Sequence, residues 1–477
     1  MEDYRFCRGR SVFMNKVPFH SPSFAGQFGV ARRDITPPLE IYARNWGAAV
    51  HDTAQFVHRP LTLTVLTVQE GDGAGEPLAL VSLDLGWWRS AEEEQILQRA
   101  LREAGIGEGR GVLALSHTHS GPGFSPALAG QPGGERIEEY LQTVCRQIRE
   151  AVAEALRTAV VGIWESAAGT CPLAQNRDLP DPQGARYLVG WNPDTAADQT
   201  LMLGRVSGAD GGCLATLVNY ACHPTILAWE NTAVSPDFVG SMREIVEKAT
   251  GAPCLFLQGA SGELAPRYQY VGDPIVADRA GCCLGHAALS VFYHMPSPGC
   301  ELAFEGAVES GAPLAIWREH ARAEVPGPVR VRQRRLELLI RPDLPSAEEL
   351  ETDLAACADR ALRERLQRKL LVRRSVGGQA TYSVDLLLWS LGEILVVAIP
   401  NEVYSAMQAD VREWAGGRPV FFITLANGGR GYLVPGKAYD EDLYAMWQSP
   451  FARGSWENCR EALEEEIKQL VREQAGG

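Results

Sequence analysis

Three histidines directly follow two apolar segments, in Ser-His-Thr-His (Ser116 to His119) and Cys-His-Pro (Cys222 to Pro224). Residues two apart in an extended segment point to the same side, so His117 and His119 can reach one centre. Zinc favours imidazole ligands, and a catalytic zinc keeps one position open for water. The alternative is a pair of hydrogen-bonded histidines in a turn. Because His223 follows a comparable segment, we predict a zinc site, with metal affinity falling at acid pH as the histidines protonate.

Five apolar segments have the pattern of strands, and each runs into a loop that carries metal-competent or catalytic residue types. The segments and the residues that follow them are 111–116 with His117 and His119, 213–219 with His223, 253–257 with Ser261, Glu263 and Arg267, 393–399 with Glu402, and 419–425 with Asn427, Arg430 and Tyr432. Sheet proteins commonly build sites from loops at the carboxyl ends of strands. We therefore expect these loops to converge.

The remaining pattern predicts further strands and several helices. The strands are expected over 61–68 and 79–84, and the helices over 91–104, 137–159, 346–371 and 456–473. Strands and helices mixed without a strict βαβ rhythm predict an α/β fold, a mixed α+β layered sheet with flanking helices and catalytic loops at strand C-terminal ends. Charged residues predict that the helix over 346–371 faces solvent. We expect an N-terminal arm over 1–25 and one domain over 26–477.

Composition excludes several classes of function. The net charge of −14 argues against a nucleic-acid surface and against docking on anionic lipid, both of which need clustered positive charge. No stretch approaches the ~20 apolar residues of a transmembrane segment. Acidic residues stand where a signal peptide would be basic, and the eleven cysteines form no CxxC pair. These features predict a cytoplasmic protein with reduced cysteines.

Four tryptophans lie near the motif segments, namely Trp87, Trp88, Trp229 and Trp447. Core packing is the favoured role for each of them, and an apolar wall for a substrate is the alternative.

Taken together, the motifs resemble the neutral (non-lysosomal) ceramidase family. The matching segments, in the family's order over roughly residues 27 to 455, are Asp34-Ile-Thr-Pro, Ser116-His-Thr-His-Ser-Gly-Pro-Gly, Asn176-Arg177, Asn219-Tyr-Ala-Cys-His-Pro, Gly259 to Pro266, Pro400-Asn-Glu402 and Asn427 to Tyr432. The resemblance implies one zinc ion, with the ligands His117, His223, Glu402 and Tyr432. It also implies that three further residues surround the reacting amide, namely His119, Arg177 and Tyr444.

The chain departs from the family in its third loop. Family members carry Gly-Asp-x-Ser-Pro, where this chain has Gly262-Glu263-Leu264-Ala265-Pro266. Ala265 therefore removes the serine hydroxyl. The chain also lacks the family's C-terminal immunoglobulin-like extension and secretion signal, which predicts a compact intracellular relative and makes ceramide itself a doubtful substrate.

The predicted reaction is hydrolysis of an N-acyl amine by zinc-activated water, on a small-molecule or lipid-like amide. His119 would move the proton to the leaving nitrogen, and Arg177 and Tyr444 would stabilise the oxyanion. The alternatives are an esterase or lactonase on the same zinc, and a non-catalytic binding relative. A TIM-barrel amidohydrolase ranks low, because its HxH follows the first strand and here it begins at residue 117.

Overall fold

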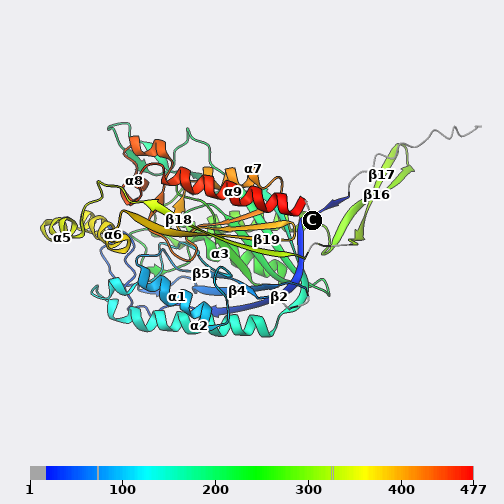
Figure 1. Cartoon of the computed structure of the whole chain (residues 1–477), viewed down its shortest axis with the longest axis horizontal. Coiled ribbons are helices and arrows are strands. Elements are labelled where there is room, and N and C mark those ends of the chain that lie inside the picture. The colour runs from blue at the N-terminus through cyan, green and yellow to red at the C-terminus, as the bar shows by residue number, and fades with distance from the viewer. Residues whose placement is uncertain (1–17, 72, 74, 324, 326, 476–477) are drawn as a thin grey trace, which may run out of the picture.

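Two β-sheets pack face to face, with helices outside each of them (Figure 1). The computed structural model describes residues 18–71, 73, 75–323, 325 and 327–475. The larger sheet has eight strands in the order β14-β12-β11-β7-β2-β4-β5-β6, and the smaller has four in the order β18-β19-β20-β22. This architecture confirms the predicted α/β layered fold with flanking helices.

The strands of the eight-stranded sheet are β2 (Ser23–Asp34), β4 (Thr62–Gln69), β5 (Leu78–Leu83), β6 (Gly111–Leu115), β7 (Val160–Thr170), β11 (Thr200–Gly208), β12 (Cys213–Tyr220) and β14 (Cys254–Gln258). Those of the four-stranded sheet are β18 (Val329–Leu339), β19 (Thr381–Leu391), β20 (Ile394–Ala398) and β22 (Val420–Ile423). Three neighbouring pairs are parallel, namely β5 with β6, β12 with β14 and β20 with β22.

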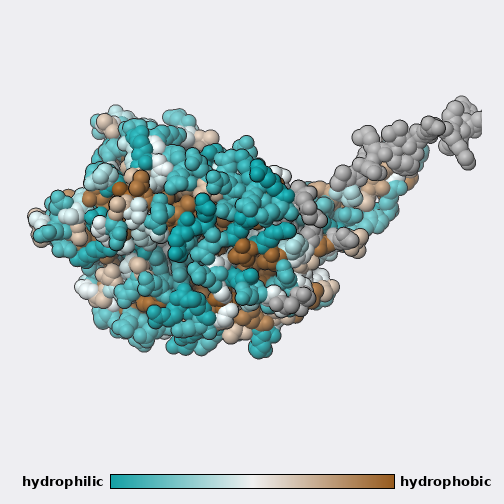
Figure 2. Space-filling view, viewed as in Figure 1, coloured by the Kyte–Doolittle hydropathy of each residue, from teal (hydrophilic) through white to brown (hydrophobic). Residues whose placement is uncertain are grey.

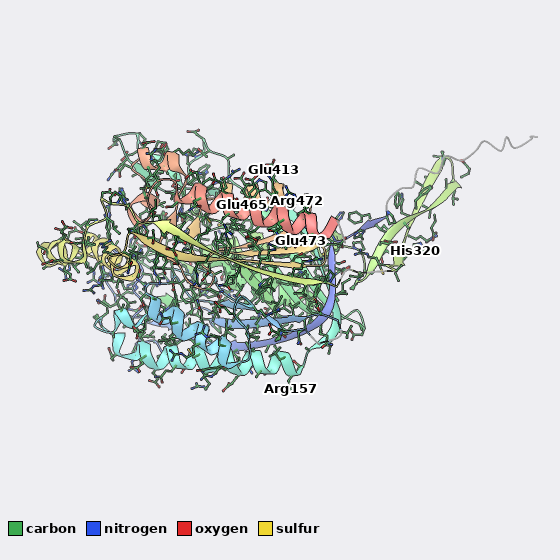
Figure 3. The ribbon with its side chains drawn as sticks, viewed as in Figure 1. Arg157, His320, Glu413, Glu465, Arg472 and Glu473 are labelled. Carbon is green, nitrogen blue, oxygen red and sulfur yellow. The ribbon has the colours of Figure 1, made fainter. Side chains whose placement is uncertain are left out.

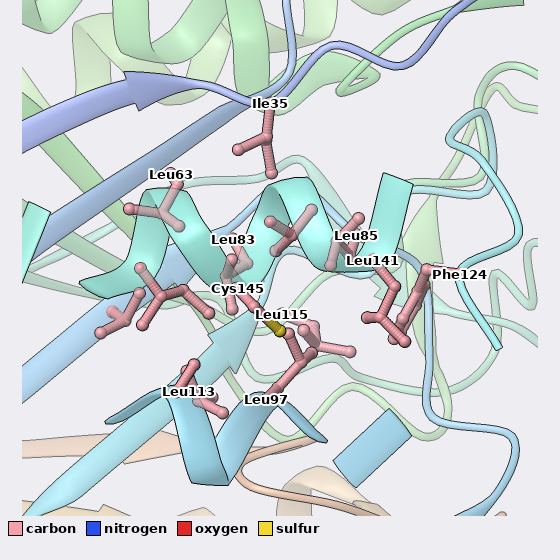
Figure 4. Packing of buried hydrophobic residues seen from close by; sticks show 14 of the residues in the cluster. Ile35, Leu63, Leu83, Leu85, Leu97, Leu113, Leu115, Phe124, Leu141 and Cys145 are labelled. Atoms are coloured by element: carbon pink, nitrogen blue, oxygen red, sulfur yellow. The ribbon is translucent and has the colours of Figure 1, made fainter. Parts of the chain in front are cut away.

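The side chains of each strand point alternately to the two faces of the sheet, and this alternation produces the layers. In β12, Leu217 faces the apolar cluster between the two sheets, and Val218 faces the helices on the outer side. Successive side chains of a strand point to opposite faces, so a strand covered on both faces is apolar throughout. The eight-stranded sheet is covered on its outer face by α1 (Ala91–Glu103), α2 (Ile137–Arg157), α3 (Phe238–Thr250) and α4 (Pro274–His294). Figure 4 shows the apolar side chains packed between α1, α2 and this sheet.

The four-stranded sheet is covered by α7 (Ser405–Trp414) and α9 (Ser455–Ala475). Apolar residues of α9 recur at helical spacing, as in Leu463, Ile467 and Leu470, and these side chains are buried. Its polar side carries charged residues, including Glu465, Arg472 and Glu473 (Figure 3). Arg332 of β18 bonds to two carboxylates of this helix, including that of Glu473 at 2.6 Å.

The predicted charged helix over 346–371 is wrong as a single element. The structure has two helices there, α5 (Ala347–Ala356) and α6 (Arg360–Val376), which extend from the body on one side (Figure 1). Asp359 begins the second helix because its carboxylate accepts a hydrogen bond from the Leu362 amide at 2.7 Å. The prediction that this segment only faces solvent is also incomplete, because Glu364 is buried.

A β-hairpin extends from the opposite side of the body (Figure 1). Its strands β16 (Cys300–Glu309) and β17 (Pro313–Ala321) pair with β1 (Phe19–His20) in a three-stranded sheet. The face in Figure 2 is mostly hydrophilic, with apolar residues in small groups. Residues 1–17 of the predicted N-terminal arm lie outside the described residues, and β2 begins at Ser23.

The remaining short elements are β3 (Phe56–Val57), β8 (Ala174–Asn176), β9 (Asp178–Pro180), β10 (Tyr187–Val189), β13 (Ala233–Val234), β15 (Leu264–Pro266), β21 (Glu402–Val403), β23 (Tyr432–Leu433), α8 (Tyr444–Gln448) and the 3-10 turns η1 (Pro126–Leu128), η2 (Gly134–Arg136) and η3 (Gly436–Asp440).

One helix in the described part of the chain, α4, is long and apolar enough to cross a membrane by length and composition. A core helix of a soluble protein passes the same test, and α4 packs closely on α3, where Gly281 faces the backbone of Phe238. Its Asp278 forms an ion pair with Arg59. These contacts make α4 part of the outer helix layer.

Candidate metal centre and active site

The strand ends that carry the candidate residues meet because hydrogen bonds join the edges of the larger sheet and connect the two sheets. The eight-stranded sheet curls until its edges approach, and Ser82 Oγ of β5 donates to the Phe256 carbonyl of β14 at 2.8 Å. The Asn219 side chain of β12 then bonds to the backbone of Phe422 in β22, at 2.8 Å to the carbonyl oxygen and 2.9 Å from the amide. The predicted convergence of the loops follows from these contacts.

The four residues predicted as zinc ligands lie together at this point. Glu402 Oε2 lies 3.3 Å from His117 Nε2 and 3.1 Å from His223 Nε2. Tyr432 Oη lies 3.3 Å from the same His223 nitrogen, and β21 and β23 pair Glu402 directly with Tyr432. All four side chains are buried.

The hydrogen bonds of the two histidines point their free nitrogens at the carboxylate. His117 Nδ1 lies 3.1 Å from the Gly86 carbonyl and His223 Nδ1 lies 3.1 Å from the Leu264 carbonyl. A carbonyl only accepts, so each Nδ1 donates and each Nε2 is left with a lone pair. Two lone pairs then face one oxygen of Glu402, and the single hydroxyl proton of Tyr432 can serve only one of them.

A cation resolves this clash of acceptors. Burial and then the Arg177 charge lower the pKa of His223 to about 3, so that ring does not readily take up a proton instead. A tetrahedral zinc with ligands at ~2.0–2.1 Å places its ligand atoms roughly 3.4 Å apart, close to the 3.1–3.3 Å separations seen here. Backbone carbonyls on the second ring nitrogen are also typical of metal-ligating histidines. The donor set therefore fits a zinc ion.

His119 lies beside this cluster. The side chains of His117, His119 and His223 each offer a ligand atom within 4.8 Å of the others, so the three could also hold an ion together. Both ring nitrogens of His119 are buried and have no hydrogen-bond partner in the described structure. Its ring packs 4.8 Å from the ring of Trp87 and 5.4 Å from that of Trp46, between centroids. Burial lowers its pKa well below the ordinary value, so the imidazole is neutral.

Arg177 and Tyr444 reach the same place from two further segments. Arg177 donates from Nε and Nη2 to the Gly262 carbonyl and from Nη2 to Tyr432 Oη at 2.9 Å. The Tyr444 ring lies 6.0 Å from the Tyr432 ring. The structure thus brings all seven predicted site residues together. Within this group, the hydrogen bonds of the Arg177 side chain go to Tyr432 and to the Gly262 carbonyl.

A pocket of about 440 Å³ opens on this group. It is lined by Trp46, Gly47, His119, Arg177, Val189, Thr225, Trp229, Tyr270, Ala361, Glu364, Arg365, Arg368, Tyr432, Tyr444 and Gln448. Trp46, Trp229 and Tyr270 form an aromatic wall with centroid separations of 5.7–6.2 Å. A smaller adjoining pocket of about 60 Å³ contains Trp87, His117, His119 and Glu402. The pocket can hold an organic substrate against the candidate metal ligands.

Three of the four tryptophans take the two roles considered from the sequence, and Trp447 takes neither. Trp87 and Trp229 line the pockets. Trp88 also borders the smaller pocket, but it is 4% exposed and its Nε1 donates to the Leu425 carbonyl at 2.8 Å. Trp447 supports the Arg365 guanidinium, whose carbon lies 3.5 Å from its ring centroid.

The third loop supports the site without lining it. The Glu263 carboxylate accepts from the amide of Ser405 at 2.9 Å and so caps α7, and Ser261 Oγ accepts from Gln258 at 2.6 Å. Ala265 is buried in β15, where it pairs with Gln175 of β8. The backbone of this loop holds the other residues, through Gly262 to Arg177 and Leu264 to His223.

Asn427 and Arg430, also singled out from the sequence, are structural. The Asn427 side chain bonds to the backbone of β6, and Arg430 Nη2 bonds to Glu94 at 2.8 Å. Gly429 between them has φ of 149°, and a Cβ there would lie 2.1 Å from the Pro400 carbonyl, so only glycine fits. This loop fixes the position of Tyr432.

Sequence reasoning missed the residues that complete the pocket. Trp46 and Tyr270 lie in loops without a catalytic motif, and Arg365 and Arg368 lie on a helix predicted to face solvent. The one available signal was the apolar spacing at Leu370 and Leu371, which are buried and turn one side of α6 inward.

The arrangement is the fold of the neutral ceramidases, as the resemblance in the motifs predicted. The neutral ceramidase from Pseudomonas aeruginosa superposes with a TM-score of 0.69 over 94% of this chain and 75% of its own, at 18% sequence identity. A ceramidase complexed with C2 gives a TM-score of 0.68 over 94% of this chain and 76% of its own, at 16% identity. No family model and no curated protein matches the sequence.

Proposed function

We propose that the protein is a zinc-dependent amidase that hydrolyses an N-acyl amine. The observation that carries this proposal is the convergence of two imidazole lone pairs on one carboxylate oxygen, beside a pocket for an organic ligand. The fold shared with the two ceramidase structures supports amide hydrolysis as the reaction. His117, His223, Glu402 and Tyr432 would hold the ion.

A zinc ion there would supply a Lewis acid and a bound water of lowered pKa. His119 is neutral and its nitrogens are unpaired, so it can accept a proton from water and pass it to the leaving nitrogen. Arg177 orients Tyr432 through its hydrogen bond at 2.9 Å. Tyr444 lines both pockets, where its hydroxyl can donate to an oxyanion.

Two alternatives remain as outcomes of the test. An ester or lactone would react at the same carbonyl-activating site, and a non-catalytic relative would bind its ligand without turnover. Catalysis is supported by the position of His119, whose two unpaired nitrogens lie beside the candidate metal ligands, where a proton could be transferred.

The test combines metal analysis with kinetics. Purified protein is expected to contain close to one equivalent of zinc and to hydrolyse members of a panel of N-acyl amines of graded chain length. Matched esters in the same panel separate amidase from esterase. The metal-site variant His117→Ala should lose zinc and turnover, whereas His286→Ala on the exposed side of α4 should retain both.

Two results would overturn the proposal. The first is protein without zinc that gains no activity when zinc is added. The second is turnover that survives His117→Ala.

A further inference from the structure

The two adjoining pockets carry an excess of positive charge in an acidic protein. Their lining contains four arginines, namely Arg89, Arg177, Arg365 and Arg368, against the glutamates Glu364 and Glu402. The whole chain carries a net charge of −14. A cleft lined by one sign of charge concentrates ligands of the opposite sign.

The two glutamates are already engaged. Glu402 faces the candidate metal ligands, and Glu364 accepts from Arg368 at 3.0 Å. Among the described residues, Arg368 is the only one of the four arginines with a carboxylate within ion-pair distance. Arg89 is buried and donates a hydrogen bond to Asn45 Oδ1 at 3.0 Å. Arg177 donates to Tyr432 and to a backbone carbonyl.

Arg365 differs from the other three because its guanidinium forms no hydrogen bond in the described part of the chain. Its guanidinium carbon lies over the Trp447 ring, 3.5 Å from the ring centroid, and the Trp447 indole donates a hydrogen bond to Asp442 at 2.5 Å. Stacking holds the planar fork in place and leaves its N–H edge available. The same pocket is also lined by the aromatic group of Trp46, Trp229 and Tyr270.

We propose that the substrate carries an anionic group close to its amide bond, a carboxylate or a phosphate, and that Arg365 binds it. Arginine matches either group with two parallel hydrogen bonds. The apolar part of the substrate lies against the aromatic wall. The inference rests on the proposed amidase function and narrows it from N-acyl amines in general to anionic ones such as N-acyl amino acids.

Four N-octanoyl amides that differ in the charge of the amine part test this. They are N-octanoylglycine, the phosphate ester of N-octanoylethanolamine, N-octanoylethanolamine and N-octanoylethylenediamine. With the zinc-loaded full chain, kcat/KM is expected to favour one or both anionic amides over the neutral one by about tenfold, the effect of one charge-assisted hydrogen bond. The cationic amide should be poorest. The relative rates of the first two separate carboxylate from phosphate.

Arg365→Gln should remove the preference, mainly by raising KM for the anionic amides far more than for the neutral one. Arg373→Gln makes the same change of charge two turns further along α6, at a residue that does not line the pocket, and should retain the preference. Equal rates for all four amides, or a preference that survives Arg365→Gln, would overturn the inference.

Binding separates this inference from the proposed reaction. Octanesulfonylglycine and octanesulfonylethanolamine are sulfonamides and are not expected to be hydrolysed, so calorimetry reports their affinity alone. Tighter binding of the anionic sulfonamide, lost in Arg365→Gln, supports the anion site even if no amide is turned over. Turnover of amides with equal binding of both sulfonamides contradicts the anion site and leaves the amidase proposal standing.

Discussion

The histidine cluster and the Glu94–Arg430 ion pair are two buried polar groups joined by one loop, and they differ in how their atoms are used. Both terminal nitrogens of Arg430 bond to Glu94, which also accepts from the Gly429 amide at 2.9 Å. In the histidine cluster, His117 Nε2 and both nitrogens of His119 have no partner among the described residues. Paired groups hold the loop in place, whereas unpaired groups are available for a ligand.

The largest difference between the effect on activity and the effect on stability is expected for His119→Phe. Loss of the proton-transferring imidazole should lower kcat by roughly 10²–10⁴-fold. The free energy of unfolding should stay the same or rise, because phenylalanine keeps the packing on Trp46 and Trp87 and removes two unsatisfied nitrogens. Steady-state kinetics and urea unfolding of one preparation check both. A clear loss of stability with unchanged kcat would assign His119 a structural role.

Arg430→Met should show the opposite behaviour. It leaves the Glu94 carboxylate buried without its partner, and the expected cost is about 3–5 kcal/mol of unfolding free energy. The double variant with Glu94→Leu removes both charges and should recover much of that loss. A double-mutant cycle in urea gives the coupling, and additive effects would show that the pair does not stabilise the loop.

Glu263 in the third loop extends the comparison to the pH dependence of stability. Burial raises the pKa of Glu263 to about 7, so the folded protein keeps a proton that the unfolded chain releases nearer its ordinary pKa. Stability from this group is therefore present at low pH and lost as pH rises through about 7. Between pH 5 and 8 the wild type should lose about 2–3 kcal/mol more than Glu263→Gln does.

The exposed control Glu230→Gln should follow the wild type over the same pH range. If the Glu263→Gln and wild-type curves run parallel, the carboxylate is ionised throughout and the capping of α7 is a charged one.

The smallest effect is expected at the aromatic wall. Trp229→Ala removes one ring that packs on Trp46 and Tyr270, and KM should rise about five- to tenfold, or about 1 kcal/mol. Stability should change little, because Trp229 is 36% exposed. Trp191→Ala, a similarly exposed ring that packs on Arg267 outside the pocket, is the control for kinetics. An equal rise of KM in both variants would exclude a specific wall.

The sequence was sufficient where local pattern determines structure. Apolar runs predicted β6, β12, β14, β20 and β22, and the loops after them contain the candidate metal ligands. His117 and Glu402 are 285 positions apart in the sequence, yet His117 Nε2 lies 3.3 Å from Glu402 Oε2. Local pattern could not show that these two residues meet. The family resemblance supplied that pairing. Neither pattern nor resemblance revealed Trp46 or Arg365, because their role depends on how a loop and a helix pack across the pocket. The cytoplasmic location stays a prediction.

Helix α6 has a consequence for the timing of ligand exchange. Its first half is held by polar contacts with the loop after Arg44, such as Arg360 to the Ala49 carbonyl at 2.9 Å, whereas buried leucines begin only at Leu370. Segments with few buried apolar contacts open locally at low free energy. We therefore expect its first two turns to exchange amide hydrogens sooner than the long helix α2. Opening of this wall would then admit ligands, and its opening rate would limit how fast products leave.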